Sequence, residues 1–253
     1  MALLTIQFPG QSIGKQTAMH VILPPGKGPF PVLYLLHGLS DDYTIWLRRT
    51  SIERYVEGRN LMVVMPDGGR SFYCNDGRPG GPAYEDHIAR DVVGFVDNTF
   101  RTIAGRRGRA IAGLSMGGYG AVMLAMRHPE LFSVACSHSG AVTFMHAALI
   151  GTPPAVHPDV GALAASLPTD GHYDLFALAQ GVGPARSRPA LRLDCGRDDF
   201  LLKDNRAFHA HLKKAGYRHT YREYPGAHSW DYWDEHIRES IAFIMKNLRA
   251  KKH

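Results

Sequence analysis

Residues 113–118 read GLSMGG, and this stretch closes one apolar run and opens a second, periodic one. Such a junction predicts that a β-strand turns sharply into an α-helix at Ser115. A serine at this turn holds its hydroxyl above the edge of the sheet. Residues 113 and 117 must be small, because strand and helix pass too close there for side chains. The pattern Gly-x-Ser-x-Gly therefore predicts an α/β fold with Ser115 as a nucleophile.

Size and composition fit one folded domain. The chain has 253 residues, of which 45% are hydrophobic and 21% are charged. This supplies enough apolar side chains for one large core, and the charged fraction is that of an ordinary globular domain. We therefore expect a single domain over residues 1–253. No stretch approaches the ~18 apolar residues of a membrane-spanning helix, so no membrane span is expected.

The N-terminus and the cysteines indicate a reducing compartment. Residues 1–16 lack a basic segment followed by an apolar run and a cleavage site, the features of a secretory signal. The three cysteines are too widely spaced for a disulfide framework or a CxxC metal pair. Cys74 lies in a loop, where it could be a free thiol. We expect a cytoplasmic protein.

The charge balance is basic, with a net charge of +6. Part of the excess is local, because several arginines precede the GLSMGG stretch within residues 101–109. A nucleic-acid site is one interpretation, but no aromatic residues are interleaved with these arginines. We favour a solvated loop that at most attracts anionic substrates, and we expect no nucleic-acid partner.

Continuous apolar strands indicate a parallel sheet buried on both faces. Residues 32–36 (VLYLL) and 61–65 (LMVVM) are two such strands, while residues 3–8 and 17–23 read as an antiparallel pair joined by a Pro-Gly turn. The remaining expected strands are 131–136, 189–195 and 219–224. The expected helices are 46–57, 83–100, 119–127, 204–215 and 232–249. Alternating strands and helices predict a doubly wound α/β fold, a mostly parallel sheet with helices on both faces.

Residues 141–187 fit this alternation poorly, because they carry several prolines and glycines and only short helical runs. We expect a small irregular, cap-like insertion that lies over the carboxyl edge of the sheet and shapes a substrate pocket. The alternative is a long surface connection without a functional role.

An activated serine needs a histidine as base and an acid that orients the histidine. On this fold the three follow in the order serine, acid, histidine, each beyond the end of a later strand. The loop after residues 189–195 offers Asp198 and Asp199, and the loop after the last strand offers His228. We favour Asp199, because it adjoins the apolar residues 200–202 and can be held buried; Asp198 remains the alternative.

Two backbone N–H groups must stabilise the negative charge that develops on the substrate oxygen. One is expected from Met116, the residue after the nucleophile. The loop after residues 32–36 begins with His37 and Gly38, so we assign the second donor to Leu39. Among nearby side chains, Trp46, His138 and Trp230 are candidates to contact a substrate. Asp67 reads as a structural residue at a strand end.

Metal and cofactor signatures are lacking in the sequence. His209 and His211 are two positions apart on an expected helix, so they point to different sides. The chain has no HExxH motif, and GLSMGGYG lacks the lysine of a phosphate-binding loop. We expect neither a metal nor a cofactor.

Several stretches together resemble the esterase D-like putative esterase family of the α/β-hydrolase superfamily. They are residues 33–46 (LYLLHGLSDDYTIW), 63–75 (VVMPDGGRSFYCN), 109–122 (RAIAGLSMGGYGAV), 195–208 (CGRDDFLLKDNRAF) and 224–233 (YPGAHSWDYW). That family includes S-formylglutathione hydrolases, tributyrin-type and feruloyl esterases and, more distantly, mycolyltransferases. The resemblance implies Ser115 as nucleophile, Asp199 as acid and His228 as base, with oxyanion amides at Leu39 and Met116.

Together these features predict a serine carboxylesterase that hydrolyses short-chain acyl esters, small-molecule substrates, through an acyl-enzyme. One alternative is an S-formylglutathione hydrolase-type thioesterase, although His37 to Asp41 (HGLSD) replaces the Ser-Gly-Leu-Thr-Cys type of loop usual in those enzymes. Another is a feruloyl or acetyl esterase that acts on carbohydrate esters. A third is an inactive hydrolase fold that serves as a binding module, against which a complete triad argues. The sequence leaves both a monomer and a homo-oligomer open.

Overall fold

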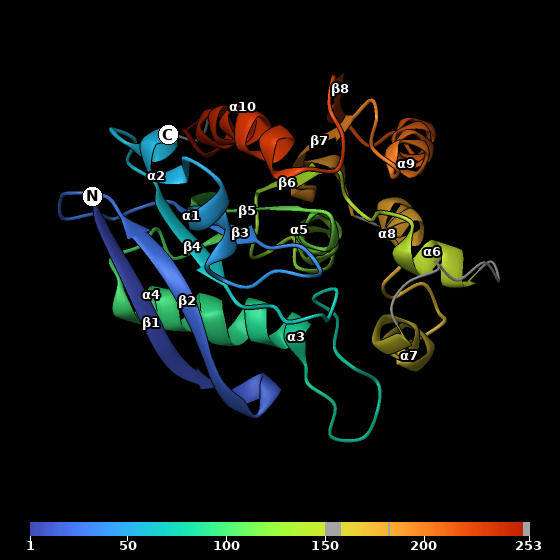
Figure 1. The fold of residues 1–253 in the computed structure, drawn as a ribbon, viewed down its shortest axis with the longest axis horizontal. Coiled ribbons are helices and arrows are strands. Elements are labelled where there is room, and N and C mark those ends of the chain that lie inside the picture. The colour runs from blue at the N-terminus through green and yellow to red at the C-terminus, as the bar shows by residue number, and fades with distance from the viewer. Residues whose placement is uncertain (150–157, 182, 250–253) are drawn as a thin grey trace.

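The computed structural model describes residues 1–149, 158–181 and 183–249. At its centre lies a sheet of eight strands with helices on both sides (Figure 1). The strand order is β1-β2-β4-β3-β5-β6-β7-β8. β2 pairs antiparallel with β1 and β4, and the other pairs are parallel. The strands are β1 (Ala2–Gly10), β2 (Lys15–Leu23), β3 (Val32–Leu36), β4 (Met62–Pro66), β5 (Arg109–Leu114), β6 (Val134–His138), β7 (Ala190–Gly196) and β8 (His219–Tyr224). The expected α/β-hydrolase architecture is confirmed.

β3 and β4 are apolar at every position because the two faces of each strand line different hydrophobic cores. In β3, Tyr34 and Leu36 point into one hydrophobic core, and Leu33 and Leu35 point into the other. The second core is covered by α1 (Ile45–Arg49), α2 (Ile52–Val56) and α10 (Trp230–Arg249). The first is covered by a π-helical turn (His87–Val92), α4 (Val93–Thr99), α5 (Met116–Arg127) and α9 (Leu202–Lys214). The short helix α3 (Tyr84–Asp86) directly precedes the π-helical turn. Figure 1 shows α10 and α4 on opposite sides of the sheet.

Two helices that the sequence predicts as continuous are interrupted. The helix expected over residues 46–57 is split between α1 and α2, because Thr50 is extended and the Ser51 N–H donates to the Asp234 carboxylate on α10 (2.7 Å). The helix expected over residues 83–100 contains the π-helical turn. These breaks arise from tertiary contacts and local widening, which apolar periodicity does not reveal.

The link between the first two strands also differs from the expected Pro-Gly turn. β1 continues through Pro9 and Gly10, and a 3₁₀ turn over Gln11–Ile13 follows. Gly14 closes this turn with φ of 63°, a left-handed conformation that favours glycine.

The segment over residues 141–187 is more helical than expected. Its described parts form α6 (Phe144–Leu149), α7 (Pro158–Ser166), α8 (Leu175–Gly181) and a 3₁₀ turn (Ala185–Ser187). α8 lies against α5 and α9, and α6 lies against α7 and α8 (Figure 1). Buried side chains of α7 and α8 join the same hydrophobic core as α5. Residues 150–157 and 182 lie outside the described residues, and the role of this segment as a cap stays a prediction.

A buried carboxylate attaches this segment to the rest of the domain. Glu85, only 2% exposed, accepts hydrogen bonds from Arg127 Nε (2.6 Å), His128 Nε2 (2.8 Å) and the Tyr173 hydroxyl (2.7 Å). Burial works to raise the pKa of Glu85, but these hydrogen bonds outweigh burial and bring the pKa to about 2, against an ordinary value of 4.5. Glu85 is therefore ionised, and it joins α3, the end of α5 and the turn before α8.

Candidate active site

Ser115 stands at the junction of β5 and α5 in a strained backbone conformation. Its φ of 52° and ψ of −117° lie outside the regions that L-residues favour. Its N–H donates to the His138 carbonyl (3.0 Å), and its own carbonyl accepts from the Ala141 N–H (3.0 Å). Both neighbours belong to the adjacent strand β6 and the loop that follows it, so the surrounding backbone stabilises the turn.

The glycines on either side of Ser115 are required by close backbone contacts. A Cβ on Gly113 would lie 2.4 Å from the Gly117 carbonyl oxygen. A Cβ on Gly117 would lie 2.6 Å from the carbonyl oxygens of both Leu36 and His37. Because these obstacles are backbone atoms, neither can move aside cheaply. The steric reason for Gly-x-Ser-x-Gly is thus present in the structure.

The structure brings Ser115 together with the expected base and acid, each from a different strand end. His228 follows β8, and its Nε2 lies 3.0 Å from Ser115 Oγ. Asp199 follows β7, and its Oδ2 lies 2.9 Å from His228 Nδ1. Since Nδ1–H donates to Asp199, Nε2 presents its lone pair to the serine hydroxyl. Such a geometry permits transfer of the serine proton to the imidazole.

Asp199 is buried and held in its ionised form. Burial works to raise the pKa of Asp199, but hydrogen bonds from His228, the Leu201 N–H and the Ser139 hydroxyl outweigh it, so the pKa lies below its usual range. The Leu201 N–H donates to Oδ1 at 2.8 Å. The alternative acid, Asp198, is exposed to solvent. The geometry favours Asp199 over Asp198 as the partner of His228.

The two expected oxyanion donors belong to different segments, Leu39 to the loop after β3 and Met116 to the start of α5. Met116 is the first residue of α5, so its N–H is one of the helix N-terminal groups without an intrahelical acceptor. Within the described part of the chain, neither this N–H nor that of Leu39 has a protein acceptor at hydrogen-bond distance. Both are free to bind an oxygen of a ligand.

His37 orients the peptide that carries the Leu39 N–H. The Gly68 N–H donates to His37 Nε2 (2.8 Å), so the ring proton is on Nδ1, which donates to the Gly38 carbonyl (2.7 Å). In a trans peptide the C=O and the following N–H point in opposite directions. Fixing the Gly38 carbonyl therefore also fixes the direction of the Leu39 N–H.

Two of the three side chains expected to contact a substrate are core residues. Trp46 is 1% exposed, and its Nε1 donates to the Leu36 carbonyl (3.0 Å). His138 is fully buried in β6 and bonds to Asp194 (2.9 Å between Nδ1 and Oδ1). The expectation that Trp46 and His138 contact a substrate is corrected accordingly. Trp230 is partly exposed and packs edge-on against Trp46, so it stays a candidate.

Two further residues lie next to the triad, although the sequence predicts for neither of them a contact with His228 or Trp233. Ser139 is buried with φ of 47°, and its Oγ accepts the Trp233 indole N–H (3.3 Å). Phe200 is 75% exposed, and its ring centroid lies 4.5 Å from that of His228. Their positions depend on contacts between distant segments, and no motif in the sequence identifies them. Asp67 is structural as expected: its Oδ1 accepts from the Gly69 N–H (3.1 Å).

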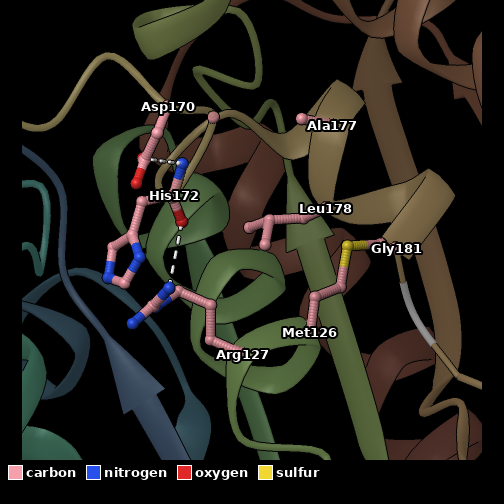
Figure 2. Close-up of a pocket in the computed structure, with 8 residues that line it drawn as sticks. Met126, Arg127, Asp170, His172, Ala177, Leu178 and Gly181 are labelled. Carbon is pink, nitrogen blue, oxygen red and sulfur yellow. Dashed lines mark hydrogen bonds between the residues drawn. The ribbon is translucent and has the colours of Figure 1, made fainter.

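One cavity lies away from these residues. It has a volume of about 420 Å³. Figure 2 shows that Arg127, from the end of α5, donates to the His172 carbonyl at its wall. The lining residues are Met126, Arg127, Asp170, Gly171, His172, Ala177, Leu178 and Gly181. None of the residues expected in the active site lines this cavity, so we do not assign the catalytic reaction to it.

The described residues contain neither a candidate metal-binding group nor a candidate membrane-spanning helix. No group of three or more His, Cys, Asp or Glu side chains there could hold a metal ion. None of the described helices is both long enough and apolar enough to cross a membrane.

Comparisons with known proteins agree on one family. Residues 10–244 match the family model described as putative esterase. An acetyl esterase of Caldicellulosiruptor saccharolyticus is 28% identical, and the alignment covers 97% of this chain and 99% of that protein. A fluorophosphonate-binding serine hydrolase F of Staphylococcus aureus, solved with bound substrate, is 29% identical with a TM-score of 0.85, covering 96% of this chain and 98% of the other. An S-formylglutathione hydrolase of Staphylococcus aureus gives 29% identity, a TM-score of 0.83 and the same coverage.

Proposed function

The chain belongs to the putative esterase family and is a carboxylic ester hydrolase, and from this premise we propose that Ser115, His228 and Asp199 carry out the hydrolysis of short-chain acyl esters. The observation that carries the proposal is the pair of contacts made by His228, 3.0 Å to Ser115 Oγ and 2.9 Å to Asp199. This is the hydrogen-bonded arrangement that converts a serine hydroxyl into a nucleophile.

In the first half of the reaction the ester acylates Ser115. His228 Nε2 takes the hydroxyl proton as Ser115 Oγ attacks the ester carbonyl carbon. The Leu39 and Met116 N–H groups then stabilise the tetrahedral oxyanion. When the intermediate collapses, the alcohol oxygen leaves with the proton from His228. Asp199 stays ionised throughout and holds the imidazole in the required tautomer.

In the second half water hydrolyses the acyl-enzyme. His228 removes a proton from the water as its oxygen attacks the acyl carbon, and the same N–H groups stabilise the second oxyanion. Ser115 Oγ then leaves with that proton, and the carboxylic acid is released.

Replacement of the nucleophile tests the proposal. The variant Ser115→Ala should lower kcat for p-nitrophenyl acetate by about 10⁴ or more. A fluorophosphonate should label the unmodified enzyme once and leave this variant unlabelled. The matched control is Ser40→Ala, which removes an exposed hydroxyl of the oxyanion loop and should keep both labelling and turnover. Near-normal turnover by Ser115→Ala would refute the assignment.

The acyl and alcohol preferences require a substrate panel. We propose a preference for short acyl chains, which esters with acyl groups of two to twelve carbons would reveal as a fall in kcat/KM with length. Likeness to a solved S-formylglutathione hydrolase supports thioester hydrolysis as the alternative. Comparing S-formylglutathione with p-nitrophenyl acetate at equal concentration separates the two. A feruloyl ester and an acetylated sugar test the carbohydrate-ester alternative.

We also propose that the enzyme works in the cytoplasm on small-molecule esters. Cys74, Cys136 and Cys195 are all free and buried, as expected in a reducing compartment. Cell fractionation tests the location, and size-exclusion chromatography with light scattering decides between a monomer and a homo-oligomer.

A further inference from the structure

Phe200 places an aromatic ring in solvent directly beside the proposed base. Three large hydrophobic side chains are exposed among the described residues, and the other two, Met1 and Leu3, lie at the N-terminal end of the chain. Single exposed apolar residues are common on protein surfaces. The position of Phe200 is informative instead, because its ring contacts the imidazole of His228, with 4.5 Å between the ring centroids.

Two aromatic rings contact His228, and they differ in how far they are buried. Trp233, which is buried in α10, contacts His228 edge-on with 4.9 Å between ring centroids. Phe200 contacts the same imidazole but is three-quarters exposed. The imidazole therefore contacts one buried ring, the indole of Trp233, and one exposed ring, the phenyl of Phe200. Of these two rings, only that of Phe200 is largely accessible to a ligand in solvent.

The reaction decides which half of an ester lies near His228, and this step rests on the proposed function. The acyl carbon bonds to Ser115 Oγ, and its oxygen points to the Leu39 and Met116 N–H groups. The oxygen of the leaving alcohol must come within hydrogen-bond distance of His228 Nε2 to receive its proton. The alcohol half of the ester therefore lies beside His228, the residue whose imidazole Phe200 contacts, while the acyl half is bound through Ser115.

We propose that Phe200 forms a leaving-group subsite that binds alcohols carrying a flat ring, and that the physiological substrates are esters of such alcohols. An exposed phenyl ring offers an apolar flat surface on which an aromatic ring or the C–H face of a pyranose can stack. The flanking residues Arg197 and Asp198 are exposed and polar. They leave hydroxyl groups at the edge of such a ring in contact with polar groups or water. The shared chemistry is a flat ring with an apolar face, whether aryl or sugar.

The test compares acetate esters that differ only in the alcohol. Phenyl acetate, an acetylated methyl glucopyranoside and ethyl acetate are assayed with the unmodified enzyme, Phe200→Ala and the control Leu3→Ala. For each ester, the ratio of variant to unmodified kcat/KM removes differences in leaving-group reactivity. Phe200→Ala should lower kcat/KM by about tenfold for the ring esters and by less than about twofold for ethyl acetate. Loss with phenyl acetate alone identifies an aryl alcohol, and loss with the glucoside identifies a sugar.

A second measurement isolates the alcohol subsite from acylation. The acyl-enzyme formed from p-nitrophenyl acetate partitions between water and an added alcohol, whose oxygen bonds to the acyl carbon while Ser115 Oγ leaves. His228 takes the alcohol proton and returns it to Ser115. Phe200→Ala should reduce transfer to benzyl alcohol about tenfold relative to water and leave the ethanol-to-water ratio unchanged.

The outcomes separate this inference from the proposed function. Equal losses with all three esters, or an unchanged benzyl alcohol ratio together with an unchanged kcat/KM for the glucoside, would overturn the subsite and show that Phe200 only supports His228. Retained turnover in Ser115→Ala would instead refute the proposed mechanism, whatever Phe200→Ala does.

Discussion

Replacing Glu85 by Gln removes one charge from a buried cluster and changes little in volume. Glu85 accepts hydrogen bonds from Arg127, His128 and Tyr173, and these hold its pKa at about 2 against the opposing effect of burial. A carboxyl group of ordinary pKa 4.5 in the unfolded chain and about 2 in the folded protein stabilises the fold by about 3 kcal/mol at neutral pH. This is a sizeable share of a typical folding free energy of about 5–15 kcal/mol.

The sign of the pH dependence follows from the lowered pKa. The stabilisation is fully present above the unfolded pKa, and it is lost as the pH falls toward the folded pKa. The difference in the free energy of unfolding between unmodified enzyme and Glu85→Gln should thus be constant from pH 7 to about pH 5.5 and should shrink by roughly 1.4 kcal/mol by about pH 3.5.

Equilibrium urea unfolding at pH 7 and pH 3.5 measures both quantities. The matched control is Glu223→Gln, because Glu223 also has a pKa of about 2, set chiefly by a hydrogen bond from Arg206. Arg206 is 57% exposed, so solvent screens that pair and its loss should cost far less than the loss of Glu85. A Glu85→Gln effect below about 1 kcal/mol at pH 7, or one that is equal at both pH values, would refute the reasoning.

Three further outcomes are expected. Asp199→Asn should lower kcat for p-nitrophenyl acetate about 10⁴-fold, because an amide cannot hold the base in the required tautomer; a loss under about a hundredfold would point to another acid. Ser139→Ala should destabilise the fold by about 1–3 kcal/mol in urea titrations, since the buried Trp233 indole loses its acceptor, and an unchanged stability would argue against that hydrogen bond. Burial raises the pKa of all three cysteine thiols, that of Cys136 to about 12, so a disulfide reagent should react with none at pH 8 until denaturant is added. Rapid modification of the native enzyme would contradict their burial.

Local sterics made the core of this fold predictable. The turn at Ser115 needs glycine at 113 and 117 because backbone atoms lie within 2.6 Å of any Cβ there, and that requirement is visible in six residues. The run at residues 32–36 is likewise apolar at every position because both faces of β3 are buried. In a parallel sheet the loops that follow β5, β7 and β8 lie at the same edge. The expected order of these loops along the chain therefore pointed to Asp199 and His228 as the partners of Ser115.

Long-range contacts were not predictable in the same way. A tryptophan such as Trp46 suits a substrate pocket and a protein core equally well, so its identity does not reveal which of the two it occupies. In the folded protein Trp46 is buried in the core, where Trp230 packs edge-on against it. Phe200 illustrates the opposite case. The apolar residues 200–202 were expected to bury Asp199; the acid is buried, yet Phe200 itself is exposed. Hydrophobicity alone does not say which side of a loop faces solvent.

The distance along the chain between Ser115 and His228, 113 residues, has a consequence for how the enzyme is produced. His228 follows β8, the last strand, which lies at one edge of the sheet and pairs only with β7. The ribosome adds residues from the N-terminus onward, so Ser115 is synthesised before the residue that can remove its proton. We expect such incomplete chains to be chemically inert. Labelling of Ser115 by a fluorophosphonate would then report when β8 and the loop that carries His228 are in place, which makes the nucleophile an internal probe of their assembly.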